Sequence, residues 1–406
     1  MKKNIVIIMI LFFIMNALNN LGHPVTPSYV RYLEIPEYMF GIFYATMSLG
    51  MMLASPLWGS LGDTRKSKSL IFIGIIIYAL AQIGFGLVHN QYLMVLFRFI
   101  GGIGIAAPLT LFVTLIIGYS DNNRIRNLAI LAALSTLGAS LGYKIGGMLG
   151  DSDAFNKLIP TPSYENIFIL QALSFAVFNI FVILFIKDYK KEDVISKRKN
   201  PFASLGKIKT LDTKFLLFLI SLTLITMGST NLGKYIDVYF NDLNLSTNSL
   251  GDFVLVTGIV SVLTSIFIVP IVSKFKKQLT FIIILQILSS IIVFYVFRAN
   301  NFILTIYTVY NVYIIFKAIY LPLEQNYISR HADKDSIGTI TGIRQSFVSI
   351  GNVIGPLVGG LLYSVRPLLL FDVSGILFLL GALLLFIVLI LQKRGLKEQN
   401  IEQEIL

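Results

Sequence analysis

Long apolar stretches alternate with short polar segments along the whole chain. A helix of about 20 apolar residues crosses the ~30 Å hydrocarbon core of a bilayer. The pattern therefore predicts an all-α membrane protein with roughly twelve transmembrane helices. The predicted helices cover residues 4–30, 38–61, 69–88, 92–117, 127–150, 165–186, 214–240, 248–272, 278–298, 302–329, 337–363 and 367–392.

Two short patterns each occur in both halves of the chain. The longer one is Gly138-x-x-x-Gly142-Tyr143-Lys144-x-Gly146-Gly147, which returns as Gly351-x-x-x-Gly355-Pro356-x-x-Gly359-Gly360. The shorter one is Asn20-Leu21-Gly22-His23, which returns as Asn231-Leu232-Gly233-Lys234. Small residues four apart let two helix backbones approach closely. The repeats predict two pseudo-symmetric six-helix bundles, as in secondary transporters that rock one half against the other.

The same division gives the predicted domains. The first bundle covers residues 1–186 and the second covers 214–392, with a basic cytoplasmic linker at 187–213 and a cytoplasmic tail at 393–406. No small-residue cleavage site follows the Met1-Lys2-Lys3 start. We therefore interpret the first apolar run as a retained helix rather than a signal peptide.

Composition agrees with a bilayer environment, because a chain that is 55% hydrophobic and 13% charged has too little polar surface for a soluble protein. If both termini are cytoplasmic, most of the 33 lysine and arginine residues face the cytoplasm, as the positive-inside rule requires. The net charge of +12 is then a topological signal, and the linker is expected to contact lipid headgroups, with no nucleic-acid partner. The expected location is a bacterial cytoplasmic membrane, crossed many times.

Enzyme chemistry finds no support in the sequence. The absence of cysteine excludes disulfides, thiol catalysis and thiolate metal sites. There is no P-loop and no H-E-x-x-H motif, and His23, His89 and His331 are dispersed. We expect neither a cofactor nor a metal, and an ATP-driven pump is not expected.

The chain resembles the major facilitator superfamily in its two six-helix halves and in three motifs. The loop Gly59-Ser60-Leu61-Gly62-Asp63-Thr64-Arg65-Lys66-Ser67-Lys68 is similar to the family's G-x-L-a-D-r-x-G-r-K/R motif, with Lys66 and Ser67 departing from it. Arg98-x-x-x-Gly102-x-Gly104-x-Ala106-Ala107 is similar to a motif of proton-coupled members. The repeated glycine pattern is similar to that of the drug:proton antiporter group, although Tyr143 replaces the proline of the helix-five copy.

The resemblance implies gating roles for the loop residues Gly59, Asp63, Arg65 and Lys68. Asp63 would bond the free amides at the start of helix eleven, near Ser336, and lock the cytoplasmic side of the outward-facing state. The alternative is a polar loop whose basic residues only anchor the topology.

Ionisable side chains within the predicted spans are informative, because a charge at mid-membrane costs ~2.5–3.5 kcal/mol and is retained mainly for function or pairing. The basic ones are Arg98, Lys144, Lys234, Lys317 and Arg344, and the acidic ones in or near spans are Asp237, Asp252, Glu324 and Asp372. Snorkelling is an alternative explanation for Arg98 and Lys144. The excess of basic groups favours anionic, zwitterionic or neutral amphipathic substrates.

Three pairings follow from position. Asp237 is three residues from Lys234, which favours a local i,i+3 pair. Glu324 lies two turns from Lys317 on one helix face, and we expect it to exchange protons. Lys144 and Asp252 lie at similar depth on helices that adjoin in the superfamily. We expect them to form a desolvated gate on the outer side.

Two polar stripes occupy equivalent helices. They are Asn16, Asn19, Asn20 and His23 in the first helix, and Thr226, Thr230, Asn231 and Lys234 in the seventh. In the superfamily these helices border the central cavity, so the stripes are candidate substrate-facing surfaces, and interhelical hydrogen bonding is the alternative. His23 is either a pH-responsive group or a packed or capping residue before proline.

The sequence thus predicts a secondary active transporter that exports small amphipathic compounds by alternating access, with a proton or sodium as coupling ion and membrane lipids around it. One alternative is a transporter of the same fold for an anionic metabolite, sugar derivative or lipid. Another is a non-transporting receptor or lipid-binding scaffold. The candidate substrate and coupling residues are Asn16, Asn19, Asn20, His23, Arg98, Asn231, Lys234, Asp237, Lys317 and Glu324.

Overall fold

The computed structural model describes residues 2–120, 124–151, 163–187, 211–275, 277–330 and 337–405. The described secondary structure is entirely helical. Within these ranges, eleven helices are long and apolar enough to cross a membrane, and one shorter apolar helix covers Lys3–Asn19. The all-α fold class and the number of predicted membrane segments are therefore confirmed.

The chain forms two compact units. Unit 1 comprises Met1–Pro201 and Lys234–Val262, and unit 2 comprises Phe202–Gly233 and Leu263–Leu406. The division cuts through α9 (Thr213–Asp242), so the last part of this helix belongs to unit 1. Nearly all of α10 (Thr247–Leu263) belongs to unit 1 as well. The domain boundaries that the sequence predicts, on either side of a linker at 187–213, remain predictions.

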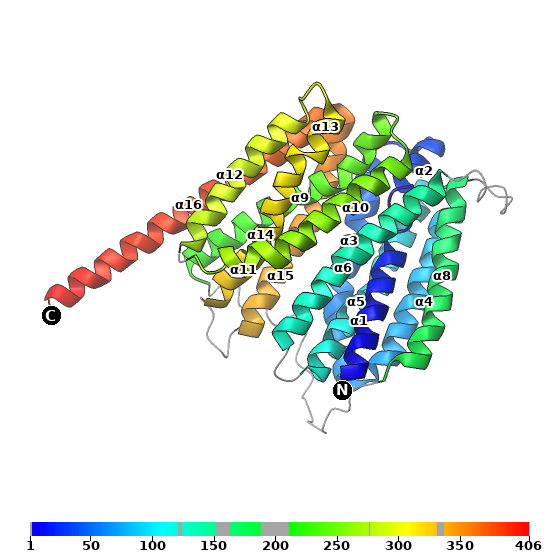
Figure 1. Ribbon diagram of the computed structural model, residues 1–406, viewed down its shortest axis with the longest axis horizontal. Coiled ribbons are helices and arrows are strands. Elements are labelled where there is room, and N and C mark those ends of the chain that lie inside the picture. Colours follow the sequence, from blue (N-terminus) through cyan, green and yellow to red (C-terminus); the bar gives the residue numbers. More distant parts are fainter. Residues whose placement is uncertain are drawn as a thin grey trace. The chain divides into compact units, whose positions relative to one another are not determined.

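Unit 1 is a bundle of long helices in which α5 occupies a central position (Figure 1). α5 packs against α3 and α4, α4 packs against α8, and α1 packs against α6. The helices of this unit, besides parts of α9 and α10, are α1 (Lys2–Asn19), α2 (Thr26–Tyr32), α3 (Tyr38–Thr64), α4 (Ser67–Leu87), α5 (Gln91–Tyr119), α6 (Arg124–Gly150) and α8 (Ser163–Phe185).

Glycines allow α5 to touch two neighbours at once. A Cβ atom on Gly102 would overlap the carbonyl oxygen of Met47 on α3. A Cβ atom on Gly104 would lie 2.6 Å from the backbone nitrogen of Tyr78 on α4. Arg98 lies one helical turn before Gly102 and so on the same face of α5. This close packing fixes the position of Arg98 within the unit.

The first predicted helix is interrupted, contrary to the single span expected over 4–30. α1 ends at Asn19 and α2 begins at Thr26, with turns between them. Pro24 has no backbone N–H and disfavours a helical conformation at His23. A 3.3 Å hydrogen bond from the His23 N–H to the Asn20 carbonyl forms a turn within the break. The equivalent segment of the second half lies inside the continuous helix α9.

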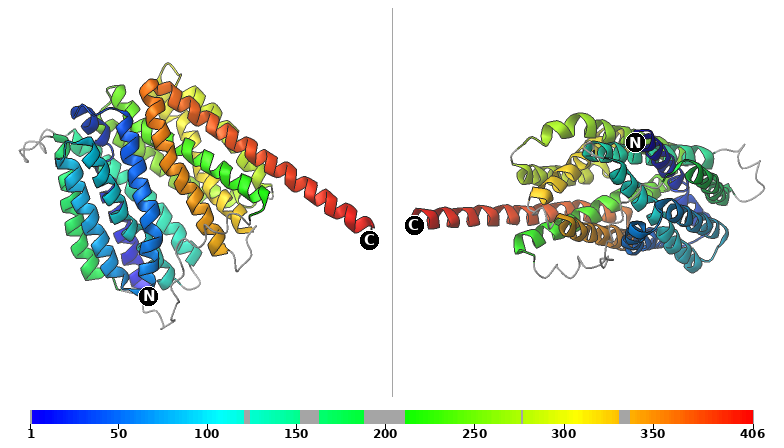
Figure 2. Two further views of the ribbon diagram at one scale, coloured as in Figure 1. Left: turned by 180° about the vertical axis from the view of Figure 1, so that it is seen from behind. Right: turned by 90° about the horizontal axis from the view of Figure 1, so that it is seen from below.

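Unit 2 contains the remaining helices. α12 packs against α14 and α16, and α15 packs against α16. Figure 2 shows α16 as one uninterrupted helix, which continues well beyond residue 392, where the predicted span ends. The helices after α10 are η2 (Thr264–Ile268), α11 (Val269–Val272), α12 (Gln278–Val296), α13 (Phe302–Tyr307), α14 (Val309–Arg330), α15 (Ile337–Val365) and α16 (Pro367–Ile405).

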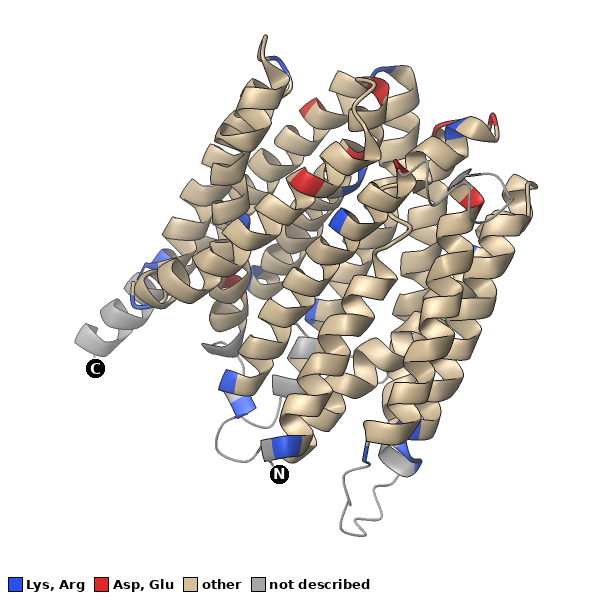
Figure 3. Cartoon of the chain, turned by 45° about the vertical axis from the view of Figure 1, so that its right-hand side comes forward, with Lys and Arg blue, Asp and Glu red and all other residues tan. Residues whose placement is uncertain are grey.

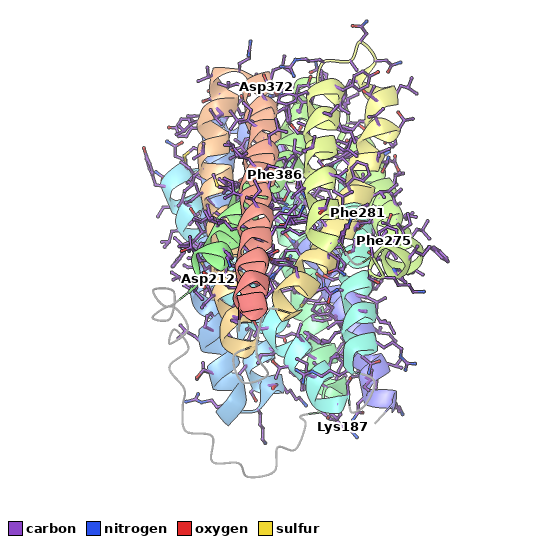
Figure 4. The ribbon with its side chains drawn as sticks, turned by 90° about the vertical axis from the view of Figure 1, so that its left-hand side faces the viewer. Lys187, Asp212, Phe275, Phe281, Asp372 and Phe386 are labelled. Carbon is purple, nitrogen blue, oxygen red and sulfur yellow. The ribbon has the colours of Figure 1, made fainter. Side chains whose placement is uncertain are left out.

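Two side-chain contacts join neighbouring helices of unit 2 near their ends. Phe275, after α11, packs edge-on against Phe281 of α12 at 5.8 Å between ring centroids (Figure 4). Arg298, after α12, donates a 2.6 Å bond to Asp372 near the start of α16. The π turn η2 precedes Pro270, which cannot donate a backbone hydrogen bond to the preceding turn.

Charged residues gather at the ends of the helices. In unit 1, lysine and arginine lie mainly at the helix ends beside the N-terminus, and most acidic residues lie toward the opposite ends (Figure 3). This is the distribution that the positive-inside rule produces.

Candidate functional site

Unit 1 contains a group of buried and half-buried polar side chains among its helices. We call it the His23 cluster. Its members come from the α1–α2 break, α3, α5, α6 and α9, and they are His23, Tyr44, Arg98, Tyr143, Lys234 and Asp237. The sequence predicted four of these as substrate or coupling residues and Lys144, beside Tyr143, as a gating residue. The structure brings the four together within one unit.

The His23 ring lies between two tyrosine rings. Its centroid is 5.4 Å from that of Tyr44 and 5.5 Å from that of Tyr143, with interplanar angles of 19° and 12°. The Tyr44 hydroxyl lies 2.5 Å from His23 Nδ1. The proline-induced break thus presents the imidazole to α3 and α6 instead of leaving it on a helix face.

Lys234 extends this chain of hydrogen bonds. Its Nζ donates a 2.6 Å bond to the Tyr44 hydroxyl oxygen and lies 4.1 Å from the Tyr44 ring centroid. Because the Tyr44 oxygen accepts from Lys234, the Tyr44 proton is available to His23 Nδ1. This arrangement favours a neutral His23 with its proton on Nε2.

Asp237 is the acidic member of the cluster and is only 1% exposed. Its Oδ2 accepts a 2.9 Å bond from the Tyr143 hydroxyl, whereas its Oδ1 is buried without a hydrogen-bond partner among the described residues. Lys234 precedes Asp237 by one turn of α9. Burial penalises the ionised carboxylate, while Lys234 and the Tyr143 bond favour it.

Arg98 is buried without a carboxylate partner among the described residues. It is 7% exposed, and its guanidinium carbon lies 3.6 Å from the Phe85 ring centroid. One terminal nitrogen is 3.5 Å from Thr26 Oγ1, and Nε has no hydrogen-bond partner. Snorkelling toward water therefore does not explain Arg98.

A second set of buried polar side chains caps the end of α1. Gln171 of α8 is fully buried and donates to the carbonyls of Leu18 and Asn19 at 2.7 and 2.9 Å. Gln82 of α4 donates a 3.0 Å bond to Gln171 Oε1. These bonds supplement the longer ones that the same carbonyls accept, at 3.3 Å from the Leu21 N–H and at 3.5 Å from the Tyr78 hydroxyl. Neither glutamine is among the residues predicted from the sequence, although a lone glutamine within an apolar span is a signal for such a role.

The predicted contact between Lys144 and Asp252 is present. Lys144 Nζ lies 2.6 Å from Asp252 Oδ1 and donates a 2.7 Å bond to Asn248 Oδ1, which joins α6 to α10 within unit 1. The expectation of a desolvated pair is wrong, because the Asp252 side chain, in the second turn of α10, is 47% exposed. An exposed pair contributes less than a buried one. Its gating role remains a prediction.

In unit 2, Glu324 does not pair with Lys317 as expected. Both Glu324 oxygens accept bonds from Arg344 of α15, at 2.7 and 2.6 Å. Glu324 is fully buried and Arg344 is 8% exposed. Lys317, on α14, is an exposed residue. A bidentate arginine reaches Glu324 across helices more readily than a lysine two turns away on the same helix.

Members of both polar stripes form interhelical hydrogen bonds. Asn16 Oδ1 accepts a 2.8 Å bond from Ser135 of α6. Thr230 of α9 donates a 2.9 Å bond to Asn352 Oδ1 of α15. Asn16 and Thr230 thus join neighbouring helices, as the alternative interpretation stated. Asn20, just after α1, donates only a local bond to the Asn16 carbonyl. For Asn19 and Asn231, whose Oδ1 atoms are buried without partners among the described residues, substrate contact remains a prediction.

The glycine motifs pack equivalent helices in the two units. Cβ atoms at Gly138, Gly142 and Gly146 of α6 would overlap the backbone of the first membrane segment. In unit 2, Gly351 and Gly355 of α15 face α9, with the added Cβ of Gly355 at 3.1 Å from the Met227 carbonyl oxygen. Gly147 instead faces Thr247, at the start of α10. The remaining motif residues of α15, Pro356, Gly359 and Gly360, are buried.

The loop motif after α3 is only partly described. The Asp63 side chain and Ser336 lie outside the described residues, so their predicted contact remains a prediction. A Cβ atom added to Gly59 would lie 3.8 Å from the Thr110 methyl group on α5. Arg65 is exposed and Lys68 is half-buried.

Many membrane segments, a broken first helix and buried ionisable groups beside the break are features typical of membrane transporters. Residues 5–316 and 218–405 match the Major Facilitator Superfamily, and the chain belongs to this family. It is a multi-pass membrane protein.

Curated relatives agree with the resemblance to the drug:proton antiporter group. The chain is 27% identical to the quinolone resistance protein NorA of Staphylococcus aureus (strain MSSA476), over 90% of this chain and 91% of the relative. It is 23% identical to multidrug resistance protein 1 of Bacillus subtilis (strain 168), with the same coverage.

Solved structures agree on the fold. A bacterial homolog of the human lysosomal transporter Spinster, in an inward-facing and occupied conformation, matches with a TM-score of 0.72 and 13% identity. The match covers 95% of this chain and 96% of that one. The nucleoside transporter NupG matches with a TM-score of 0.72 and 13% identity, over 95% and 98% of the two chains.

Proposed function

We propose that this protein is a proton-coupled exporter of small amphipathic compounds that works by alternating access in a bacterial cytoplasmic membrane. Both termini would lie in the cytoplasm, since the basic helix ends surround the N-terminus. The names of the relatives, which refer to quinolone and multidrug resistance, support export of drug-like compounds. Transport rather than catalysis is the function that the family suggests.

Asp237 carries the proposal of proton coupling. It is a buried carboxylate with one oxygen bonded to Tyr143 and one without a donor. Burial and a neighbouring cation act on its charged form in opposite directions. The oxygen without a donor is the position at which a coupling proton would bind.

Glu324, the sequence-based candidate for proton exchange, fits this role less well. Protonating it would leave the buried Arg344 guanidinium without its charged partner, which is strongly unfavourable. We propose that Glu324 and Arg344 stabilise the contact of α14 with α15. Lys144 and Asp252 would form a gate on the side that we assign as extracellular.

Flux in proteoliposomes tests the proposal. Purified protein is reconstituted, and a pH or voltage gradient is imposed with cationic, neutral and anionic compounds. We expect saturable flux that collapses when the proton gradient is dissipated, and Asp237→Asn should retain exchange down a substrate gradient while losing proton-driven accumulation. Asp212→Asn, an exposed carboxylate ahead of α9, is the matched control.

Two outcomes would favour the alternatives. Accumulation driven by a sodium gradient, with no response to pH, would replace the proton as coupling ion. Saturable binding without any flux would indicate a receptor or lipid-binding scaffold instead of a transporter.

A further inference from the structure

We infer that residues 234–262, which we call the α9–α10 hairpin, move as one piece relative to unit 2, with Gly233 and the π turn η2 as hinges. The hairpin is the last part of α9, the connection after it and nearly all of α10. The inference rests on the proposed alternating access and names the element that moves, whereas the sequence predicted that whole halves rock. The chain passes between the two units at two places here, after Gly233 and after Val262.

The partners of α9 change within about one helical turn at Gly233. Before this glycine, Thr230 donates a 2.9 Å bond to Asn352 of α15, and both residues belong to unit 2. After it, Lys234 donates a 2.6 Å bond to the Tyr44 hydroxyl of α3, and both residues belong to unit 1. The helix itself is continuous across this position. Its two parts are therefore bonded to different units.

Gly233 has no packing reason to be glycine. Apart from the backbone of its own helix, no described heavy atom lies within 4 Å of a Cβ atom added there, and the residue is exposed. At Gly228 of the same helix, by contrast, an added Cβ would lie 2.9 Å from the Ser374 carbonyl oxygen of α16. Glycine inside a helix is less favourable than alanine, because it keeps more conformational freedom outside the helix. A glycine without a packing role, at the boundary between the units, indicates where α9 bends.

The second passage, after α10, has an irregular backbone. α10 packs on α6 as far as Gly258, where an added Cβ would overlap the Ser140 hydroxyl. The π turn Thr264–Ile268 follows, with Pro270 two residues after it, and both η2 and α11 pack against α14 of unit 2. π turns and prolines are two of the established causes of a bend within a helix. Both passages between the units therefore lie at positions where a helix bends readily.

Between the hinges, polar contacts hold the hairpin to unit 1. Asp151, after α6, accepts a 2.6 Å bond from the Thr247 hydroxyl and a 2.9 Å bond from the Asn248 N–H at the start of α10. Asn241, near the end of α9, donates a 2.8 Å bond to Ser28 of α2. The hairpin also carries the two α9 members of the His23 cluster. Its movement would separate them from the members on α3 and α6, and the cluster would open without any change inside unit 2.

Distances between pairs of spin labels distinguish a moving hairpin from a rigid second bundle. The chain contains no cysteine, so labels attach only to engineered ones. The substitutions are Met148→Cys on α6, Leu243→Cys in the hairpin and Val365→Cys at the end of α15, all at exposed side chains. The pair 243–148 reports whether the hairpin leaves unit 1, and the pair 243–365 reports whether it moves relative to unit 2. Pulsed electron paramagnetic resonance of the full chain in lipid nanodiscs measures both, from about pH 5 to about pH 8.

We expect each pair to show two distances whose proportions change together. In a rigid second bundle, only the pair 243–148 would change. Gly233→Ala should lower the open fraction about fivefold, the factor that the helix preference of alanine over glycine gives, while the melting temperature stays the same or rises. Gly101→Ala of α5 is the control, because its added Cβ lies 3.5 Å or more from its neighbours, and it should leave both distance distributions unchanged.

A single 243–148 distance under all conditions, a 243–365 distance that stays fixed while the other changes, or an unchanged open fraction in Gly233→Ala would overturn the inference. The two labelled pairs in the otherwise unaltered chain decide alone if Gly233→Ala does not yield folded protein. Movement of both pairs without flux in proteoliposomes would keep the inference and refute the proposed function. Proton-driven flux with a fixed 243–365 distance would do the reverse.

Discussion

The Tyr143 hydroxyl of α6 donates a 2.9 Å hydrogen bond to Asp237 of α9, and both residues are buried. Tyr143 occupies the position where the helix-five motif of the antiporter group has proline. Its ring also stacks on His23. The departure from the motif therefore supplies a hydrogen-bond donor to the one acidic side chain of the His23 cluster.

Tyr143→Phe removes that donor and keeps the ring. Because the hydrogen bond favours the ionised carboxylate, its loss should move the pH of half-maximal proton-driven transport upward. The pH profile of flux in proteoliposomes measures this. Tyr92→Phe, at a 72% exposed tyrosine, is the control and should leave the profile unchanged. An unshifted profile in Tyr143→Phe would exclude a role for this bond in coupling.

Gln171→Leu should destabilise the protein by about 1–3 kcal/mol, because it removes the 2.7 and 2.9 Å bonds to the Leu18 and Asn19 carbonyls and leaves them only the longer bonds of 3.3 and 3.5 Å. Thermal unfolding in detergent measures the loss, and Gln345→Leu, an exposed glutamine of α15, serves as the control. If the two variants unfold at the same temperature, Gln171 does not stabilise the helix break.

Glu324→Gln should cost about 3–5 kcal/mol of stability, because it removes the charged partner of a buried arginine. Lys317→Met should cost much less, since Lys317 is exposed and has no partner among the described residues. A change of substrate selectivity in Lys317→Met would indicate contact with substrate. A large stability loss in Lys317→Met with none in Glu324→Gln would contradict the pairing of Glu324 with Arg344.

Charge reversal at Lys144 or Asp252 should reduce transport, and the double reversal should restore much of it. The reason is that the 2.6 Å contact joins α6 to α10 and each single reversal replaces attraction by repulsion. The exposed position of Asp252 limits the coupling energy to about 1 kcal/mol. A double-mutant cycle of flux rates at matched abundance measures it, and no recovery in the double variant would rule out a gate.

Asp63→Asn should slow transport while leaving membrane insertion and substrate binding intact, because the proposed contact stabilises one conformation at the end of a helix. Flux and equilibrium binding are compared at equal protein abundance. The control is Asp212→Asn, an acidic residue outside the loop motif. Equal flux in Asp63→Asn and wild type would refute the gating role.

The sequence alone determined the bilayer environment, the number of membrane segments and the twofold repeat. These features follow from the length and spacing of the apolar runs. A run long enough to cross the bilayer forms a helix whatever its neighbours are. The glycines of α6 and α15 were also predictable as packing positions, because a missing side chain has the same effect in any close helix contact. The break before Pro24 could have been predicted from the proline itself.

Only the tertiary structure decided which charged groups meet. Position along one helix suggested Lys317 as the partner of Glu324, yet Arg344 from the next helix satisfies both carboxylate oxygens. Tyr44 and Tyr143 enter the His23 cluster from α3 and α6, which no spacing in the chain relates to His23. Partners in a helical bundle are chosen by the rotation and depth of each helix, and these depend on the packing of the helices against one another.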